Sequence, residues 1–299
     1  MRVTNRMLAT TVLNNVQANL KRLAKRQDQM SSGKLVRRPS DNPMALSRIM
    51  ALRRGLAEQA QHTRNMEDAM GFLDASESAL AKLTEALQRV RELTIYGASG
   101  ALSDSDRKAL AAEVDQLIDE LVQTGNSVYA GQFLFAGQKT TTSPLVRQGE
   151  TVIYQGNGSA LAWEVSPDVT MEIGVAGSQI FKAQPQAASE LFATLFEIKQ
   201  ALEDGNAQDL GGTLLGEVDK YIDHLLQMRA IYGAKSNRLR LAVDRNFDSK
   251  IKMTELLSRL EDVDLAKLAM EYSISQYVYQ AALATGAKVV QPSLVNYLT

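Results

Sequence analysis

The chain contains no cysteine, which excludes disulfide bonds and thiol chemistry. Its two histidines, His62 and His224, lie far apart in the sequence, which argues against a zinc site. Aromatic residues make up only 6% of the chain, although 45% of its residues are hydrophobic. A chain rich in Leu, Ala and Met but poor in aromatics favours helices packed along their lengths over one thick core. We therefore predict a mainly α-helical protein without a cofactor or metal ion.

Long apolar runs are also missing. No window approaches the roughly 18 to 20 consecutive apolar residues that a membrane-spanning helix needs. Residues 1–6 lead into neither an apolar signal core nor a small-residue cleavage site. We expect no membrane segment, and any export must use a route other than a cleaved signal peptide. At 299 residues the chain is longer than one core usually organises, so two or three domains are expected.

Negative charge is scarce near the N-terminus. Residues 1–60 carry 12 Lys or Arg and three Asp or Glu, while the whole chain has a net charge of −1. A basic arm can bind nucleic acid or an anionic membrane. This segment contains no aromatic side chain for base stacking, however, and its basic residues are interleaved with a regular apolar pattern. We therefore favour a helix surface that faces solvent or another subunit, with neither nucleic acid nor a membrane as partner.

Proline, which breaks helices, is absent from residues 44–143 and 186–291, so both stretches are predicted to be mainly helical. In the first stretch, residues 103–106 supply side-chain oxygens that can cap a helix, and a helical hairpin is expected around them. Its two apolar seams are Leu73, Leu80, Leu83, Leu87, Val90 and Thr94, and Leu110, Val114, Leu117, Leu121, Thr124 and Val128. In the second stretch we expect a short helix over 189–204 and a long helix that runs from about residue 213 past residue 280.

A different pattern separates the two helical stretches. Residues 138–186 are rich in Thr, Val, Gly and Pro, which predicts a small inserted β module. Its strands are predicted over residues 151–154, 161–165 and 169–173. We interpret Gly156-Asn157-Gly158 as a hairpin turn rather than a dinucleotide fingerprint, because no third glycine follows at the needed spacing. The single tryptophan, Trp163, is expected to pack in the core of the module.

Both ends of the chain carry a narrow apolar seam with alternating spacings of three and four, which is typical of helices that pair as coiled coils. The N-terminal seam consists of Ala9, Leu13, Val16, Leu20, Leu23, Gln27 and Met30. The C-terminal seam consists of Met253, Leu256, Leu260, Val263, Lys267, Met270, Ile274, Tyr277, Ala281 and Ala284. Such seams require another helix to cover them, so we predict that the protein assembles through its two ends.

No arrangement of residues predicts catalysis. The sequence shows no Ser-His-Asp set, no phosphate-binding loop and no metal-ligand spacing. Glu261, Asp262 and Asp264 cluster on the predicted long C-terminal helix, and paired carboxylates can act as acid and base when burial separates their pKa values. Nothing in the sequence suggests that they are buried, so we interpret them as a solvated face or as salt-bridge partners of a basic helix. The protein is not expected to be an enzyme.

Two terminal signatures resemble a known family. The run from Gln29 to Ala45, with its Ser-Gly, basic loop and Asp-x-Pro, is similar to the N-terminal signature of flagellin-like proteins. Within it, Gly33 suits a helix C-cap, Asp41 can cap the next helix, and Pro43 fits the first turn of that helix. Residues 261–266, 279–284 and 292–298 resemble the C-terminal signature of the same family. The likeness covers nearly the full length of the chain.

Within this superfamily, three features resemble the group of hook-associated proteins at the hook-filament junction. They are the opening residues 1–4, residues 129–137 and the ending at residues 294–298. Short flagellins share both terminal signatures, so a filament subunit is a competing hypothesis. Two further hypotheses propose other classes of protein. One is an intracellular coiled-coil adaptor, and the other is a nucleic-acid binder whose salt-dependent affinity comes from Arg37 and Arg38.

The resemblance implies a fold of long coaxial helical hairpins, formed by the N- and C-terminal halves, with a small β-rich domain inserted. The expected domains are residues 1–45 pairing with 256–299, a helical core of residues 46–137 and 187–255, and an inserted β domain of residues 138–186. The implied assembly interface comprises Leu13, Val16, Leu20, Leu23, Met30, Leu260, Val263, Met270, Ile274, Tyr277, Ala281, Leu294 and Tyr297.

The same resemblance implies a structural subunit outside the cell that forms a junction ring between hook and filament. Its implied partners are the preceding hook-associated protein, flagellin, an export chaperone and further copies of the chain. Members of the family are exported unfolded through the flagellar type III apparatus. We also expect roughly the first and last forty residues to be mobile before assembly and to become ordered only in the polymer.

Overall fold

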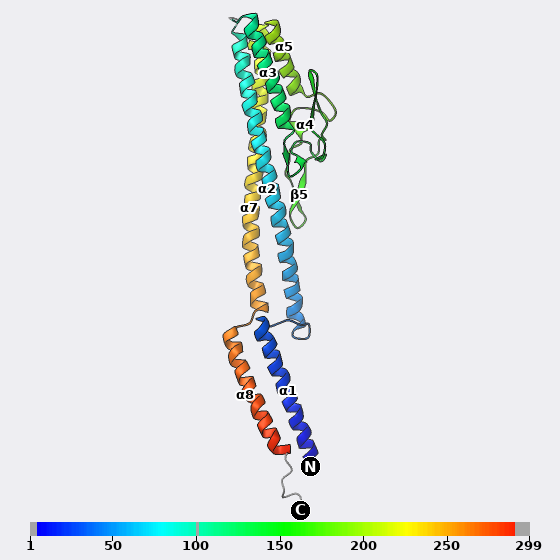
Figure 1. The fold of residues 1–299 in the computed structure, drawn as a ribbon, viewed down its shortest axis with the longest axis vertical. Coiled ribbons are helices and arrows are strands. Elements are labelled where there is room, and N and C mark those ends of the chain that lie inside the picture. Colours follow the sequence, from blue (N-terminus) through cyan, green and yellow to red (C-terminus); the bar gives the residue numbers. More distant parts are fainter. Residues whose placement is uncertain (1–4, 100–101, 291–299) are drawn as a thin grey trace, which may run out of the picture. The chain divides into compact units, whose positions relative to one another are not determined.

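The computed structural model of the protein describes residues 5–99 and 102–290, and it divides the chain into two compact units (Figure 1). Unit 1 takes in residues 1–58 and 249–299, and unit 2 takes in residues 59–248. The domain ends expected at residues 45 and 255 therefore lie inside unit 1. Two long helices, α2 (Pro43–Ala98) and α7 (Leu215–Glu261), contribute residues to both units, so the boundary falls within helices rather than in loops.

Unit 1 is built around the first and last helices of the described chain. Helix α1 spans Asn5–Ser32 and helix α8 spans Leu265–Val290, and the two lie side by side (Figure 1). Helix α1 ends where Gly33 adopts a φ of +68°, a left-handed conformation that residues with a Cβ rarely accept. The C-cap role predicted for Gly33 is confirmed, as is the start of α2 at Pro43.

The long helix predicted from residue 213 past residue 280 is interrupted, and that prediction is wrong. Helix α7 ends at Glu261 and α8 begins at Leu265. The carboxylate of Asp264 accepts hydrogen bonds from the backbone amides of Ala266 and Lys267, at 3.0 and 3.1 Å, and so caps the start of α8. The apolar spacing continues across the break, which is why periodicity alone does not reveal it.

The helical hairpin predicted in unit 2 is confirmed. It consists of α2 and α3 (Asp104–Gly125), and Ser103 forms a capping box with Asp106 at the start of α3. All six residues of the seam predicted on α2 are buried. On α3 the buried face consists of Ala111, Val114, Ile118, Leu121 and Gly125. Val128, the last residue of the predicted α3 seam, lies beyond the end of this helix in a strand and is exposed.

Three antiparallel hairpins follow α3. They pair β1 (Val128–Tyr129) with β2 (Gln132–Phe133), β3 (Leu145–Gln148) with β4 (Thr151–Tyr154), and β5 (Ala162–Ser166) with β6 (Val169–Glu172). The three predicted strands are confirmed to within one residue at each end, and β1, β2 and β3 were missed. The hairpin turn predicted at Gly156–Gly158 is wrong, because this segment joins β4 to β5, which pair with other strands.

The hairpins share one hydrophobic core with the helices of unit 2. Tyr154 and Met171 belong to the same buried cluster as Phe72 of α2 and Phe192 of α5 (Glu190–Asp204). The predicted core role of Trp163 is confirmed, because its partly buried ring packs edge to face on Phe72 with 6.1 Å between ring centroids. The remaining elements are α4 (Gly177–Ile180), α5 (Glu190–Asp204), α6 (Ala207–Asp209) and a π-helical turn, η1 (Leu210–Leu214).

Candidate assembly surface

Helices α1 and α8 contact each other through one face of each. Val12 of α1 lies against Gly286 of α8, and Leu268 of α8 is buried while Val16 of α1 and Tyr272 of α8 are half-buried. The helices approach closely at Gly286, where an added Cβ would lie 2.7 Å from Cγ1 of Val12. A larger residue at position 286 would require the Val12 side chain or the two helices to shift.

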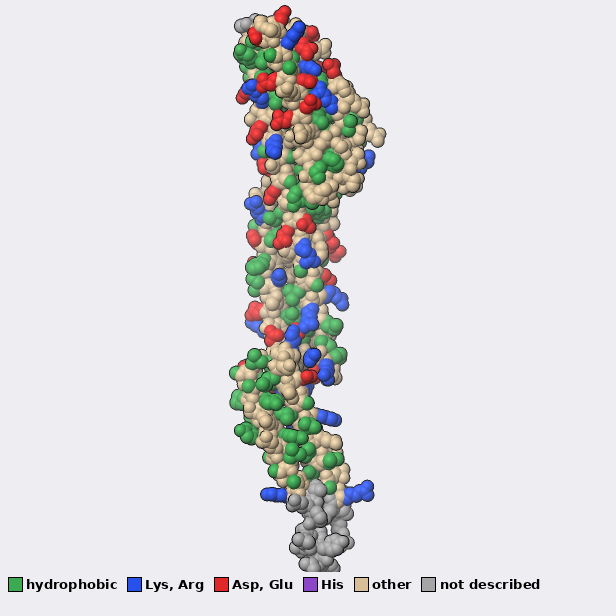
Figure 2. Space-filling model, in the orientation of Figure 1, with side chains coloured by type: hydrophobic (Ala, Val, Ile, Leu, Met, Phe, Trp, Pro, Cys, Tyr) green, Lys and Arg blue, Asp and Glu red, His purple; other side chains and the backbone are tan. Residues whose placement is uncertain are grey.

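Both helices also carry exposed apolar side chains, which we call the apolar strip. Its members are Met7, Leu8, Leu13, Leu20 and Met30 of α1, and Leu265, Met270, Ile274, Tyr277, Val278 and Leu283 of α8. Leu13 is 58% exposed, Ile274 56% and Tyr277 71%. Figure 2 shows hydrophobic side chains gathered over these two helices. An apolar patch spread over two whole helices marks an interaction surface rather than ordinary surface scatter.

The predicted interface residues separate into three groups in the structure. Leu13, Leu20, Met30, Met270, Ile274, Tyr277 and Ala281 are exposed. Val16, Leu23, Leu260 and Val263 are half-buried, and Leu294 and Tyr297 lie outside the described residues. The terminal helices pair as expected, and most of the described interface residues are exposed on the single chain, so their role in assembly stays a prediction.

The breaks between α1 and α2 and between α7 and α8 are joined by backbone hydrogen bonds, and we call this region the joint. The amide of Val263 donates to the carbonyl oxygen of Gly33 at 3.1 Å, and the amide of Leu35 donates to that of Glu261 at 2.6 Å. Lys34 and Asp262 form an isolated antiparallel bridge between them. All of these residues belong to unit 1, so the joint links the two ends of the sequence within one unit.

A buried carboxylate lies at the centre of the joint. Glu261 is 3% exposed, and its side chain accepts hydrogen bonds from the ammonium group of Lys34 and the guanidinium group of Arg53. Beside it, the buried Gln29 donates from Nε2 to the carbonyl oxygen of Leu35 at 3.0 Å. The salt-bridge interpretation of this acidic cluster is confirmed for Glu261, but the expectation that it is not buried is wrong. Its two partners lie more than 200 residues away in the sequence, so no local spacing could reveal them.

The three acidic residues of the cluster therefore have different environments. Glu261 is buried with two cations, Asp262 is exposed beside the bridge to Lys34, and Asp264 caps α8. Neither exposed carboxylate lies in a buried acid-base pair. Within residues 5–99 and 102–290, no group of three or more His, Asp or Glu side chains is placed to hold a metal ion. None of the helices in these ranges is both long and apolar enough to cross a membrane.

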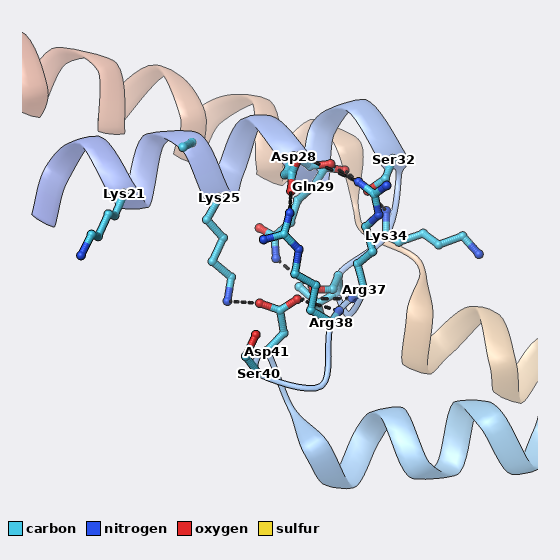
Figure 3. A pocket seen from close by; sticks show the side chains of 12 residues that line it. Lys21, Lys25, Asp28, Gln29, Ser32, Lys34, Arg37, Arg38, Ser40 and Asp41 are labelled. Carbon is cyan, nitrogen blue, oxygen red and sulfur yellow. Dashed lines mark hydrogen bonds and ion pairs between the residues drawn. The ribbon is translucent and has the colours of Figure 1, made fainter. Parts of the chain in front are cut away.

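A pocket of about 380 Å³ lies between the end of α1 and the loop that leads to α2, and we call it the basic pocket (Figure 3). Its charged lining consists of Lys21, Lys25, Lys34, Arg37, Arg38, Asp28 and Asp41. The ammonium group of Lys25 contacts Asp41 at 2.9 Å, and this contact and the backbone amide of Arg38 hold the pKa of the Asp41 carboxyl below its usual value. Because Lys and Arg outnumber Asp among the residues that line the pocket, its lining carries a net positive charge.

The predicted capping role of Asp41 is wrong. Its carboxylate accepts hydrogen bonds within the loop from the amides of Arg37 and Arg38. The cap of α2 is provided by Asn42 instead, whose Oδ1 accepts the amide of Ala45 at 3.1 Å. Both residues have side chains suited to capping, so the sequence could not distinguish between them.

Both helical ends of the chain match models of known protein families. The model of the bacterial flagellin N-terminal helical region matches residues 3–140, and the model of the bacterial flagellin C-terminal helical region matches residues 215–298. These two regions contain α1, α2, α7 and α8, the helices that form the joint and the apolar strip. The fold and the surface together define a structural protein with flagellin-type helical ends.

Individual relatives narrow this assignment. The flagellar hook-associated protein 3 of Escherichia coli is 32% identical over 85% of this chain and 86% of its own length. The flagellin of Bacillus subtilis is 25% identical over 97% of each chain. The fold is similar to that of the flagellar hook-associated protein 3 of Legionella pneumophila, with a TM-score of 0.65 and 17% identity over 71% of this chain and 98% of that one. The chain belongs to the bacterial flagellin family and, within it, groups with the flagellar hook-associated protein 3 sequences. Its role in the flagellum is structural.

Proposed function

We propose that the protein forms the ring of subunits that joins the hook to the filament of the bacterial flagellum. One side of this ring contacts the preceding hook-associated protein, and the other side contacts flagellin. The proposal is supported by the resemblance to hook-associated protein 3, which at 32% identity exceeds the 25% identity to flagellin. In this role the protein is exported unfolded through the flagellar type III apparatus, with the help of a chaperone, and acts outside the cell.

The apolar strip is the observation that carries the proposal. Burial of a Leu, Ile or Tyr side chain contributes on the order of 1.5 to 3 kcal/mol, so a strip along both terminal helices stabilises association strongly. A single chain leaves these apolar side chains of α1 and α8 exposed to water. Neighbouring subunits supply the missing cover. A tube wall of packed terminal helices is the assembly that this surface favours.

Immunogold electron microscopy of flagellated cells tests the proposal, with an antibody against residues 138–186. We expect label in a single band where the hook meets the filament. Label along the whole filament would instead establish a short flagellin, the second candidate, which is supported by the full-length match to the Bacillus subtilis protein.

A matched pair of variants connects the apolar strip to this location. Replacing Ile274 and Tyr277 with Ser removes two exposed apolar side chains of α8, and we expect the junction band and the filament to be lost. The control replaces the exposed Gln276 and Gln280 with Ser on the same helix, and should keep the band. A normal band in the Ile274→Ser/Tyr277→Ser variant would show that the strip does not hold the ring together.

A further inference from the structure

Two helices of unit 2 lie side by side at one level and carry opposite charge. Nδ2 of Asn246 on α7 donates to Oγ1 of Thr63 on α2 at 2.8 Å, and the guanidinium group of Arg229 contacts the Glu77 carboxylate at 2.8 Å, so the helices run antiparallel here. Between these contacts α2 carries four Asp or Glu and one Arg, whereas α7 carries five Lys or Arg and one Asp. Arg229 and Glu77 form the only ion pair between the two segments among the described residues. Most of this charge can therefore act on a partner.

Strand β5 lies on the other side of α2. Nδ2 of Asn65 donates to the backbone carbonyl oxygen of Glu164 on β5 at 3.0 Å, only two residues after Thr63, which contacts α7. Two residues correspond to about 200° around an α-helix. Helix α2 therefore separates α7 from β5 at this level (Figure 1).

A pocket of about 220 Å³ lies between α2 and β5, and we call it the tryptophan pocket. It is lined by Asn65, Asp68, Ala162, Trp163 and Glu164, without any Lys or Arg. Asp68 and Glu164 are exposed, and their carboxylates form no ion pair with any described residue. Carboxylates beside an indole ring suit an arginine guanidinium group, because it can pair with the acids and stack on the ring.

Cations of α7 form one exposed face on the far side of that helix, which we call the arginine face. It consists of Arg238, Leu241 and Arg245, at spacings of three and four, and Leu241 is 62% exposed. All three lie at least about 80° around α7 from Asn246 and at least about 120° from Arg229, the two residues that contact α2. Neither Arg238 nor Arg245 forms an ion pair with a described residue. The arginine face therefore points away from α2 and can meet another chain.

We propose that the arginine face of one copy docks on the tryptophan pocket of the adjacent copy of this chain. Arg238 then lies between the carboxylates of Asp68 and Glu164, with its guanidinium group against the indole ring of Trp163. The contact is heterologous, because it joins two different surfaces of the same chain, and this is the kind of interface that closes a ring.

The two surfaces lie at the same level of unit 2, so copies packed side by side can bring them together. On α2, Asp68 is five residues beyond Thr63, and on α7, Arg238 is eight residues before Asn246. At about 1.5 Å per residue, the two positions differ in height by about 4.5 Å, which is less than one helical turn. They also lie on opposite sides of α2, as a contact with a neighbour on either side requires. This contact deepens the proposed function, on which it rests, by specifying which surfaces adjacent ring subunits share.

Crosslinking between copies tests the contact. The chain has no cysteine, so introduced thiols are the only ones in the subunit. Ala162 lines the tryptophan pocket, and the exposed Ala234 precedes Arg238 by one turn of α7. Flagella from cells that make the Ala162→Cys/Ala234→Cys chain are treated with a short bismaleimide, separated on a denaturing gel and probed with the antibody against residues 138–186. We expect bands at multiples of the chain mass, and none from either single variant.

The matched control is Ser78→Cys with Ala234→Cys, since Ser78 is exposed on α2 but lies outside the tryptophan pocket. Equal crosslinking in this control, or a junction band in immunogold without crosslinked multiples, would overturn the contact and leave the proposed function intact. Absence of the junction band in cells that make the unaltered chain would overturn the proposed function, and the ring contact with it.

Charge reversal in the crosslinking chain provides a second readout. Adding Arg238→Glu should lower the yield about tenfold, because like charges then face each other across the contact. Arg240→Glu makes the same charge change at an exposed position of α7 outside the arginine face, and should keep the yield. Asp68→Lys with Glu164→Lys, added to Arg238→Glu, restores opposite charges and should recover it. An unchanged yield in Arg238→Glu, an equal loss in Arg240→Glu, or no recovery by the exchange would contradict this pairing of surfaces.

Discussion

The buried tyrosine of the β4 strand shows how single side chains fix the hairpins of unit 2. The hydroxyl group of Tyr154 shares its one proton between the carbonyl oxygens of Phe135 and Asn157, which lie 2.9 and 3.1 Å away. Its ring is fully buried, and this burial raises the pKa of the Tyr154 hydroxyl to about 12. One residue thereby connects β4 to the segment after β2 and to the connection before β5.

Replacing Tyr154 with Phe should lower the free energy of unfolding of unit 2 by about 1 to 2 kcal/mol, because two carbonyl oxygens lose their donor. The hydroxyl pKa is raised on folding, so its contribution to stability is complete below the unfolded pKa of about 10 and is lost as pH rises towards about 12. Denaturant unfolding followed at neutral and alkaline pH should show a weaker alkaline loss in the variant. The control is the exposed Tyr96→Phe, and equal stability of Tyr154→Phe and the native chain would contradict the assignment.

At the residue scale, the sequence predicts roles that depend on near neighbours. The C-cap role of Gly33 and the capping box at Ser103 follow from residues a few positions apart. The burial of Glu261 was missed because it depends on cations of two distant segments. A carboxylate is placed inside a protein only when charged partners are already there, and sequence spacing does not show such partners.

At the scale of elements, the joint holds two helix breaks together through one buried charge. Replacing Glu261 with Gln keeps the size of the side chain but leaves Lys34 and Arg53 without their anion. We expect a loss of about 1 to 3 kcal/mol in the stability of unit 1, with unit 2 unchanged. Hydrogen exchange of backbone amides measures this loss helix by helix, and α1 and α8 should exchange faster.

The control for the joint is Glu255→Gln on the same helix, where the exposed carboxylate forms only an i,i+4 pair with Arg259. Such surface pairs contribute about 0.3 to 0.5 kcal/mol, so exchange should change little. Equal protection of α1 and α8 in Glu261→Gln and in this control would mean that the buried charge does not stabilise the joint.

Elements could be predicted where periodicity and helix-breaking residues agree. The strands β4, β5 and β6 follow from their β-branched residues, and the α2–α3 hairpin from its leucine seams. The pairing of the strands could not be predicted. Strand β4 pairs with β3, which the sequence analysis did not identify, and not with β5. The break at residues 262–264 was hidden because apolar spacing continues through it, although Asp264 supplied a capping signal.

At the scale of the whole molecule, the two units differ in how much apolar surface they bury. Among the described residues of unit 1, the large apolar side chains that are buried are Val36, Ile49 and Leu268. Unit 2 contains a continuous hydrophobic core that joins α2, α3, α5, α7 and the hairpins. Stability should therefore differ between the units, because burial is the main favourable term in folding.

Limited proteolysis of the purified, unassembled chain measures this difference. We expect cleavage to remove both ends first and to leave a resistant fragment close to residues 59–248, since unit 1 has little core to protect it. The same digestion of assembled flagella is the control, in which neighbouring subunits should cover the apolar strip and protect the ends. Ends that resist cleavage as long as the middle does in the free chain would contradict coupled folding and assembly.

The sequence predicted that the protein assembles through its two ends. It did not predict which apolar residues of α1 and α8 are exposed on the single chain. The spacing of three and four identified helices that need a neighbour, but two neighbours were available, the other terminal helix and another subunit. Val12 and Gly286 bring α1 and α8 close together, while large apolar side chains such as Ile274 and Tyr277 stay exposed. Pairing of α1 with α8 thus leaves apolar side chains exposed, which the proposed assembly would cover.

The joint has a mechanical consequence. The two helix breaks are cross-linked by the hydrogen bonds from Val263 to Gly33 and from Leu35 to Glu261. A pull or a twist applied to either terminal helix is therefore divided between two covalent connections, and neither break can bend without straining the other. Load that crosses the joint is therefore shared by both connections and by the hydrogen bonds between them.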